Sequence, residues 1–280
     1  MGCLQHGEKR TILPLVGSKF ELGRLQETIA QMEDKELAEI ARAEEFYFSA
    51  KAKECVEIVG KYLNSDDVML RLSADMLYVF GNLTLGDARE AQAARADVVE
   101  CLRQSLTEET SEEIRAACIF AYYLISIFLH IRPDGEVPPL EKAIPYLPVG
   151  QRLFAVSVLA HGIYLQQEYE KAQGVVETAM LMADGTYPIP FIYLHCIAAM
   201  RQINRKNQEG AIRSVNRALE LARQDQLLEP FIEYHGLLQG VLEVCLRKNE
   251  PEVYKKLVDG IIAFSRGWMK IHNSQMDKSV

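Results

Sequence analysis

The sequence repeats itself at a spacing of 39 residues in its second half. When residues 166–183 are laid over residues 205–222, five identities fall in register, and the upstream pair Ala160 and Ala199 adds a sixth. Self-similarity with a period of about 20–50 residues is the signature of stacked repeats. Small side chains at fixed places on successive apolar helical stretches indicate helices that approach closely. The sequence therefore predicts an all-α fold, an α-solenoid of stacked antiparallel helix hairpins.

These small residues resemble the pattern of the tetratricopeptide repeat. That family has small residues where Ala160, Ala172 and Ala179 stand here, and commonly an aromatic residue at the place of Tyr169. The spacing in this chain exceeds the roughly 34 residues of the standard repeat, and no glycine marks the turn at 166–168. The resemblance thus implies a tetratricopeptide-like helix-pair architecture rather than a particular superhelical pitch.

The composition is that of a folded protein with little affinity for nucleic acid. Of the 280 residues 49% are hydrophobic and 25% charged, which is ordinary for a globular chain. A solenoid of five or six hairpins accounts for this length as one continuous body. The net charge of −8 argues against nucleic-acid binding by the chain as a whole, because phosphate contacts require a basic face.

The cysteines and the longest apolar run indicate a cytoplasmic protein. The six cysteines are widely spaced, contain no C-x-x-C pair and lie mostly in apolar helical runs, as free thiols in a reducing compartment do. No signal-peptide pattern stands near the start. The longest apolar run, residues 116–131, is shorter than the roughly 20 residues of a membrane-spanning helix. We predict no membrane contact and assign this run to a deeply buried helix.

Turn and capping residues divide the chain into helices. We expect an irregular N-terminal tail over residues 1–17, the helical-repeat domain over 18–273 and a polar C-terminal end over 274–280. A proline-rich stretch over 132–148 interrupts the repeats. The helices expected in the domain cover approximately 19–32, 35–48, 52–63, 67–82, 88–105, 112–131, 140–146, 150–167, 168–183, 191–203, 208–223, 231–247 and 251–267.

Motifs for catalysis are missing from the sequence. It contains no phosphate-binding G-x-x-x-x-G-K-[ST] loop, no G-x-S-x-G and no H-E-x-x-H. The triplet Glu233-Tyr234-His235 could suggest a ligand or a general base, but a lone histidine in a helical run is more often a packing residue. Nothing brings a nucleophile, a base and an orienting group together. We predict a protein that is not an enzyme and that needs no metal or cofactor.

Binding is better supported than catalysis. In a tetratricopeptide-like solenoid the first helix of each hairpin lines a concave groove, and aromatic residues with polar tips suit a peptide or a small ligand. The same residues could instead fill the space between neighbouring hairpins. The candidate groove residues are Phe154, His161, Tyr164, Tyr193, Met200, Tyr234 and His235.

Three segments resemble the helical-repeat region of bacterial LuxR-type transcriptional regulators of the MalT kind. They are YPIPFIYLH (187–195), EPFIEYHGLLQG (229–240) and FSRGWMKIHN (264–273). The resemblance extends over roughly residues 20–275. In those regulators a tetratricopeptide-like sensor region precedes a DNA-binding helix-turn-helix domain, and many carry an upstream ATPase module. Neither module is present in this sequence, which ends at Val280.

The resemblance implies a sensor region that binds a small-molecule inducer or a protein partner. DNA binding would belong to the missing helix-turn-helix domain, so we expect no direct nucleic-acid contact from this chain, and self-association into a homo-oligomer stays open. The alternative is a stand-alone tetratricopeptide-like adaptor that binds a peptide or protein in its concave groove. An enzyme built on a helical-repeat fold is the third class.

Overall fold

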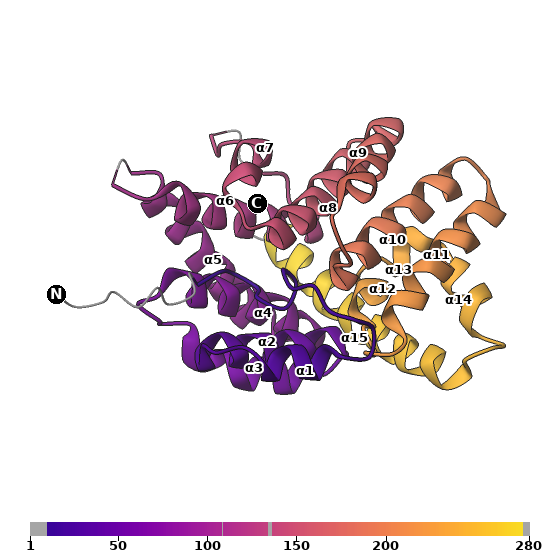
Figure 1. Ribbon diagram of the computed structural model, residues 1–280, viewed down its shortest axis with the longest axis horizontal. Helices are drawn as coiled ribbons and strands as arrows, with labels where there is room; N and C mark the ends of the chain where they lie inside the picture. Colours follow the sequence, from indigo (N-terminus) through magenta and orange to yellow (C-terminus); the bar gives the residue numbers. More distant parts are fainter. Residues whose placement is uncertain (1–9, 108, 134–135, 277–280) are drawn as a thin grey trace.

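The computed structural model describes residues 10–107, 109–133 and 136–276. Over these residues the chain forms helices and no strand (Figure 1), which confirms the all-α class. The α-helices are α1 (Leu25–Ala30), α2 (Lys35–Phe48), α3 (Ala52–Val59), α4 (Val68–Leu85), α5 (Ala88–Ser105), α6 (Glu112–Phe128), α7 (Leu140–Ala143), α8 (Val149–Leu165), α9 (Tyr169–Met182), α10 (Pro188–Asn204), α11 (Gln208–Ala222), α12 (Glu229–Glu233), α13 (His235–Leu238), α14 (Val241–Leu246) and α15 (Pro251–Met276). Two short 3-10 helices cover Gly60–Tyr62 and Ile144–Tyr146.

Side-chain caps begin several helices where the sequence predicts them. The Asp34 carboxylate accepts the backbone N–H groups two and three residues further on, at the start of α2, and Asp67 does the same for α4. The Ser111 hydroxyl caps α6 by accepting the backbone N–H of Ile114 alone. Each cap satisfies donors that the first helical turn leaves free. Gly86 ends α4 at a φ of +78°, a conformation that favours glycine.

Consecutive helices pack as pairs. α2 packs on α3, α4 on α5, α8 on α9 and α10 on α11. Ala172 of α9 and the matching Ala211 of α11 are almost fully buried, at 1% and 0% exposure. The repeat-like pairing that the 39-residue spacing predicts is therefore present.

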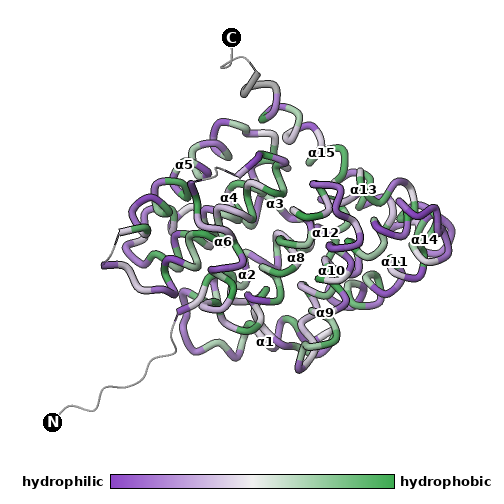
Figure 2. Tube along the Cα trace, turned by 90° about the horizontal axis from the view of Figure 1, so that it is seen from above, coloured by the Kyte–Doolittle hydropathy of each residue, from purple (hydrophilic) through white to green (hydrophobic). Residues whose placement is uncertain are grey.

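One helix from each of these pairs, together with α6 and α12, closes into a ring. α2 packs on α4, α4 on α6, α6 on α8, α8 on α10, α10 on α12, and α12 packs on α2 again. At the joint, the backbone N–H of Leu228 donates to the carbonyl of Phe48 at 2.6 Å. Figure 2 shows α5, α11 and α14 at the margin of the molecule, with α4, α8 and α10 between them. An open solenoid leaves its first and last repeats apart, whereas here they touch.

Aromatic side chains fill the interior of the ring. The Phe80 ring of α4 lies 6.3 Å from that of Tyr47 of α2 and 6.0 Å from that of Phe128 of α6. Phe128 in turn lies 5.7 Å from Tyr193 of α10 and 5.6 Å from Tyr234, just after α12. Each such aromatic pair stabilises the fold by about 0.5–1.5 kcal/mol, in addition to the free energy gained by burying its apolar surface. The middle of the ring is therefore a packed core.

The N-terminal segment enters this core, contrary to the expectation of a tail over residues 1–17. Its described part, 10–17, is irregular, but the Glu44 carboxylate of α2 accepts its backbone N–H groups from Leu15 and Val16 at 2.9 Å each. Gln151 donates to the Ile12 carbonyl at 2.9 Å. The segment is buried without forming a helix, so its apolar side chains follow no helical period. The residues 4% exposed or less are Ile12, Leu13, Leu15 and Val16.

The first expected helix, 19–32, is shorter in the structure and forms only α1. Gly23 adopts a φ of +83°, which breaks a helix at this point. The N–H groups of Gly23 and Leu25 donate to the carboxylate of Asp225, at 2.8 and 3.3 Å. A contact distant in the sequence thus takes the donors that an earlier helical turn would have used.

The expected helix over 231–247 is broken into α12, α13 and α14. Gln239 and Gly240 adopt left-handed conformations, with φ of +47° and +81°, and no helix continues through them. The last expected helix, 251–267, instead continues to Met276, so it includes the start of the expected polar end. Residues 277–280 lie outside the described part of the chain.

The apolar run over 116–131 belongs to α6, which ends at Phe128 because His130 adopts a φ of +51°. Most of the helix is buried. None of the helices in the described parts of the chain has the length and apolarity needed to span a membrane.

The last helix, α15, returns to the N-terminal half and packs against α4, α5, α12 and α14 (Figure 1). It approaches α4 closely at Gly267, where a Cβ atom would lie 1.8 Å from the carbonyl oxygen of Leu83. One turn on, the Lys270 ammonium donates to the Gly86 carbonyl at 2.9 Å. α15 therefore lies across the ring beside the ends of α4 and α6.

Candidate functional site

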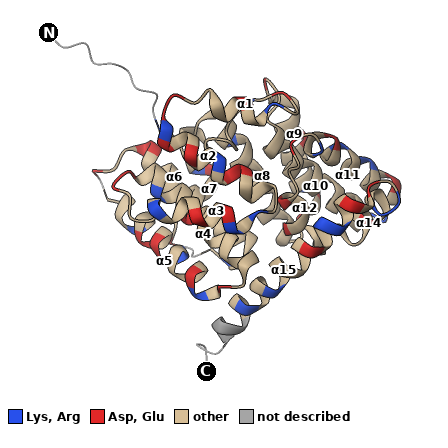
Figure 3. Cartoon of the chain, turned by 90° about the horizontal axis from the view of Figure 1, so that it is seen from below, with Lys and Arg blue, Asp and Glu red and all other residues tan. Residues whose placement is uncertain are grey.

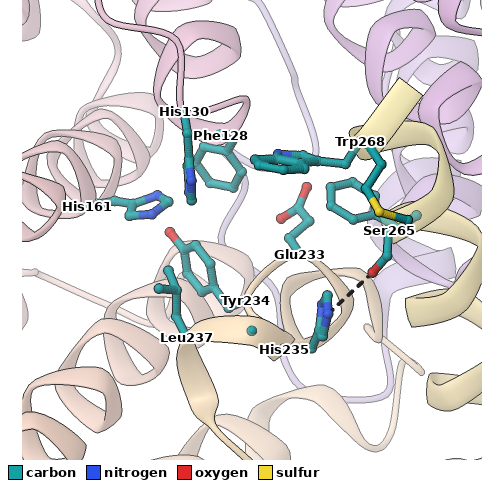
Figure 4. Close-up of a pocket in the computed structure, with 12 residues that line it drawn as sticks. Phe128, His130, His161, Glu233, Tyr234, His235, Leu237, Ser265 and Trp268 are labelled. Carbon is teal, nitrogen blue, oxygen red and sulfur yellow. Dashed lines mark hydrogen bonds between the residues drawn. The ribbon is translucent and has the colours of Figure 1, made fainter. Parts of the chain in front are cut away.

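A cavity of about 260 Å³ lies under α15 (Figure 4). Its walls come from the end of α6, from α8, from the α12–α13 junction and from α15. Small-molecule sites are concave, largely apolar and commonly about 300–1,000 Å³. This cavity lies just below that range, so its size suits only a small ligand. The ring closure brings these four elements together.

Aromatic rings form the apolar wall of the cavity. Phe128 and Tyr234 are stacked with centroids 5.6 Å apart, and the Trp268 ring lies 5.6 Å from that of His130. Phe264 lines the cavity one turn before Trp268 on α15. Trp268 is the only tryptophan of the chain. Such a wall offers both apolar contact and ring faces that attract cations.

Glu233, the last residue of α12, contributes a carboxyl group to the cavity. One oxygen accepts the hydroxyl hydrogen of Tyr193 at 2.5 Å, and the other accepts that of Tyr47. Burial raises the pKa of Glu233 to about 7, although the two tyrosine donors act in the opposite direction. Because both oxygens accept hydrogen bonds, the carboxylate is the form that these contacts stabilise.

Two buried polar side chains of the cavity have unused hydrogen-bonding atoms. Tyr234 and His161 are each 1% exposed, and their rings meet edge-on at 4.8 Å. The Tyr234 hydroxyl and both ring nitrogens of His161 have no hydrogen-bond partner among the described residues. Burial, with a smaller contribution from His130, lowers the pKa of His161 to about 3, so the imidazole is neutral. A buried polar group left unpaired costs about 1–3 kcal/mol, and a polar ligand atom would relieve this cost.

His235 and Ser265 link α13 to α15 across the cavity. His235 Nδ1 lies 2.8 Å from the Ile232 carbonyl oxygen, which can only accept, so Nδ1 carries the hydrogen of the neutral ring. Nε2 then accepts from the Ser265 hydroxyl at 3.3 Å (Figure 4). A serine and histidine so paired resemble part of a hydrolase site. However, Ser265 lies inside α15, where the neighbouring backbone N–H groups form the hydrogen bonds of the helix. They are therefore not available to stabilise an oxyanion. The pair holds α15 in position.

Three of the seven candidate groove residues line this cavity, namely His161, Tyr234 and His235. Phe154 and Tyr193 line a separate space of about 20 Å³ in the interior of the ring. Their rings lie 5.0 Å apart, and both residues are at most 3% exposed. These two residues therefore belong to the packed aromatic core.

The other two candidates, Tyr164 and Met200, are buried between helices. Met200 of α10 is fully buried, and Tyr164 of α8 is 6% exposed. The Tyr164 hydroxyl accepts a hydrogen bond from the Asn204 amide at 2.8 Å, which joins α8 to α10. They fill the space between neighbouring hairpins, the alternative that the sequence left open.

Sequence reasoning missed most of the cavity wall. Phe128 and His130 close the apolar run that we assigned to the core, and Phe264 and Trp268 lie on a helix expected to end at 267. Glu233 carried a signal, because it stands beside two of the candidates. The single tryptophan was a second signal, but nothing local placed it opposite His130.

The cavity has no metal-binding arrangement. Among the described residues, no group of three or more His, Cys, Asp or Glu side chains could hold a metal ion. No protein-family model, no curated protein and no solved structure matches the chain. The chemistry of the cavity therefore carries the functional argument.

Proposed function

We propose that this chain is the ligand-sensing region of a cytoplasmic transcriptional regulator of the LuxR type, and that a small molecule binds under α15. The observation that carries the proposal is the aromatic cavity, which holds unpaired polar atoms and has α15 as one wall. Two of the three segments that resemble LuxR-type regulators, 229–240 and 264–273, supply nine of its lining residues. The third, 187–195, supplies Tyr193, which binds Glu233.

α15 is the element that would report ligand binding. One side of it faces the cavity through Phe264 and Trp268, and Gly267 fits against α4. A ligand that prefers one placement of α15 shifts the populations by its differential affinity for the two placements. In the regulators that the chain resembles, the DNA-binding domain follows this region. We propose that a change in the placement of α15 is transmitted to such a domain.

DNA contact by the described region itself has no support in its charge distribution. Figure 3 shows acidic and basic residues interspersed along the helices, with no continuous basic stripe in that view. The net charge is −8. Nucleic-acid binding would require a basic face.

The alternative, a tetratricopeptide-like solenoid adaptor for a peptide, rests on a different observation. The ring interior already holds a peptide segment of this chain, residues 11–16, through Glu44, Gln151 and the Ser73 hydroxyl, which accepts the Leu13 N–H at 3.0 Å. A ring that holds one extended segment could exchange it for another. The small-molecule role is favoured, because the cavity under α15 needs no such exchange.

Intrinsic fluorescence tests the proposal directly, since Trp268 is the only tryptophan. A library of metabolites is screened for saturable fluorescence changes, and hits are checked by thermal shift. A ligand at 100 times its Kd should stabilise the fold by about 2.7 kcal/mol. Short peptides are included to test the adaptor.

A matched pair of variants locates the site. Tyr234→Phe removes the unpaired hydroxyl in the cavity, whereas Tyr164→Phe removes one that bonds Asn204 elsewhere. Weaker binding in the first variant alone would support the cavity. Equal losses in both variants, or a library without any saturable ligand, would contradict the proposal.

A further inference from the structure

The charge of the cavity wall restricts what its ligand can be, given the proposed ligand-binding role on which this inference rests. Glu233 is the only acidic side chain that lines the cavity, and the lining residues in the described chain include no lysine or arginine. Burial lowers the pKa of His130 as well as that of His161, so neither imidazole supplies a positive charge at neutral pH. His235 uses Nδ1 on a carbonyl and Nε2 on Ser265.

The groups that face Glu233 from other elements do not neutralise it. Tyr47 of α2 and Tyr193 of α10 donate hydrogen bonds to it. Burial and then the charge of Glu233 raise the pKa of both tyrosines well above the usual value, so they remain neutral donors. Glu229, one turn earlier on α12, is 2% exposed, and burial raises its pKa well above the usual value. The cluster therefore holds one carboxylate, supported by two hydroxyl groups, and no cationic partner.

The surroundings of this carboxylate also favour positive charge. α6 is 17 residues long and ends at Phe128 in the cavity wall. The C-terminal end of such a helix carries roughly half a negative charge. A cation over the face of an aromatic ring is stabilised by about 0.5–2 kcal/mol. Tryptophan interacts most strongly of the aromatic side chains, and Trp268 lines this cavity. The carboxylate, the helix end and the ring faces thus all favour a positively charged ligand.

We propose that the ligand of the cavity is an organic monocation, a single ammonium group on a small apolar body. The ammonium pairs with the Glu233 carboxylate, and the apolar body packs between Trp268 and the stacked rings of Phe128 and Tyr234. A polar substituent on the body reaches the Tyr234 hydroxyl and His161. A polycation would leave charges unpaired, and an anion would meet Glu233 without any cation to offset it.

Three probes of nearly equal shape test the charge: 3-phenylpropylammonium, the neutral 3-phenylpropan-1-ol and the anionic 3-phenylpropanoate. Binding is measured by Trp268 fluorescence and by calorimetry on the full chain. We expect the cation to bind saturably and more tightly than the other two. In Glu233→Gln the cation should bind roughly ten- to hundredfold more weakly, because a charged hydrogen bond is lost. Glu54→Gln, at an exposed position of α3, is the matched control.

The wild-type protein provides an independent measurement that does not depend on a variant folding. Its affinity for the cation should fall about tenfold per pH unit below the pKa of Glu233, near 7, while that for the alcohol stays constant. Glu233→Asp retains the charge, so it should retain the preference for the cation.

The outcomes separate this inference from the proposed function. If the alcohol binds as tightly as the cation, and both change the Trp268 fluorescence saturably, the cavity is a ligand site but the charge assignment is wrong. If no primary ammonium probe from butyl to 4-phenylbutyl binds saturably, the charge assignment is likewise overturned. If other compounds bind without changing the Trp268 fluorescence, and bind Tyr234→Phe as tightly as the wild type, the proposed site itself is wrong.

Discussion

Replacing Glu44 by leucine should release the N-terminal segment from the ring. Glu44 is fully buried, and its two oxygens accept the backbone N–H groups of Leu15 and Val16 at 2.9 Å each. Leucine has a similar volume but no acceptor, so both backbone donors lose their partner at once. The variant therefore tests whether hydrogen bonds or apolar contacts hold residues 10–17 in the core.

The magnitude follows from the two donors. Each buried N–H left without a partner costs about 1–3 kcal/mol, which gives about 2–6 kcal/mol for the pair. The apolar side chain recovers part of this, because burial of the Glu44 carboxyl is itself unfavourable and raises its pKa to about 8. We expect a net loss of about 2–4 kcal/mol, a large fraction of the roughly 5–15 kcal/mol that stabilises a typical domain. Glu44→Gln retains one acceptor, so its free energy of unfolding should lie between those of the wild type and Glu44→Leu.

Two assays separate the global loss from local release. Urea unfolding measures the free energy of unfolding, and hydrogen exchange measures protection of the amides of Leu15 and Val16. We expect the protection of these two amides to fall more than that of amides in the middle of the long helices. Glu54→Leu, at an exposed position, should change stability by less than about 0.5 kcal/mol. Unchanged unfolding and unchanged protection in Glu44→Leu would refute the reasoning and assign the segment to apolar packing alone.

Four further predictions concern two glycines, the buried carboxyl groups and the cysteines. Gly267→Ala should destabilise the fold by more than about 3 kcal/mol, because its Cβ would lie 1.8 Å from the Leu83 carbonyl oxygen. Gly174→Ala in the middle of α9, where nothing lies within 4 Å, should instead stabilise it by about 0.5–1 kcal/mol in the same urea assay. Burial raises the pKa values of Glu44 and Asp75 to about 8. The folded state then binds more protons than the unfolded state, so stability should fall by about 1 kcal/mol per group between pH 7 and 9, where most histidines are neutral in both states. A rise over this range would contradict both assignments. Thiol-reagent kinetics should show five cysteines that react only on unfolding, because they are buried; they are Cys55, Cys101, Cys118, Cys196 and Cys245.

Local features of the fold could be predicted from the sequence because their causes are local. Asp34 and Asp67 cap helices through N–H groups only two and three residues away. The expected helix over 88–105 coincides with α5, and the one over 208–223 ends one residue beyond α11. A helical period and a cap are both contained within a few turns, so neither depends on where the rest of the chain goes.

The ring closure depends on the summed geometry of all the helix pairs, which no local pattern encodes. Gly267 is an example, because a glycine at the end of an apolar period usually marks a helix end. Here it marks the point where α15 meets the backbone of α4, and the helix continues to Met276. The contact of Asp225 with Gly23 is equally invisible in the sequence, because it joins segments 202 residues apart.

The same closure explains why the candidate groove residues divide into core and cavity. The repeat phase predicts which side chains point inward, and Phe154, Tyr193 and His161 all do so. In an open solenoid an inward side chain lines an accessible groove, but in a closed ring it is buried by its counterparts opposite. Among the candidate residues, those at the end of the ring interior under α15 line a cavity of about 260 Å³, whereas Phe154 and Tyr193 line a space of only about 20 Å³. Ligand contact is therefore expected at the level of His161 and Tyr234, and a Phe154→Leu variant should alter stability while leaving ligand affinity unchanged.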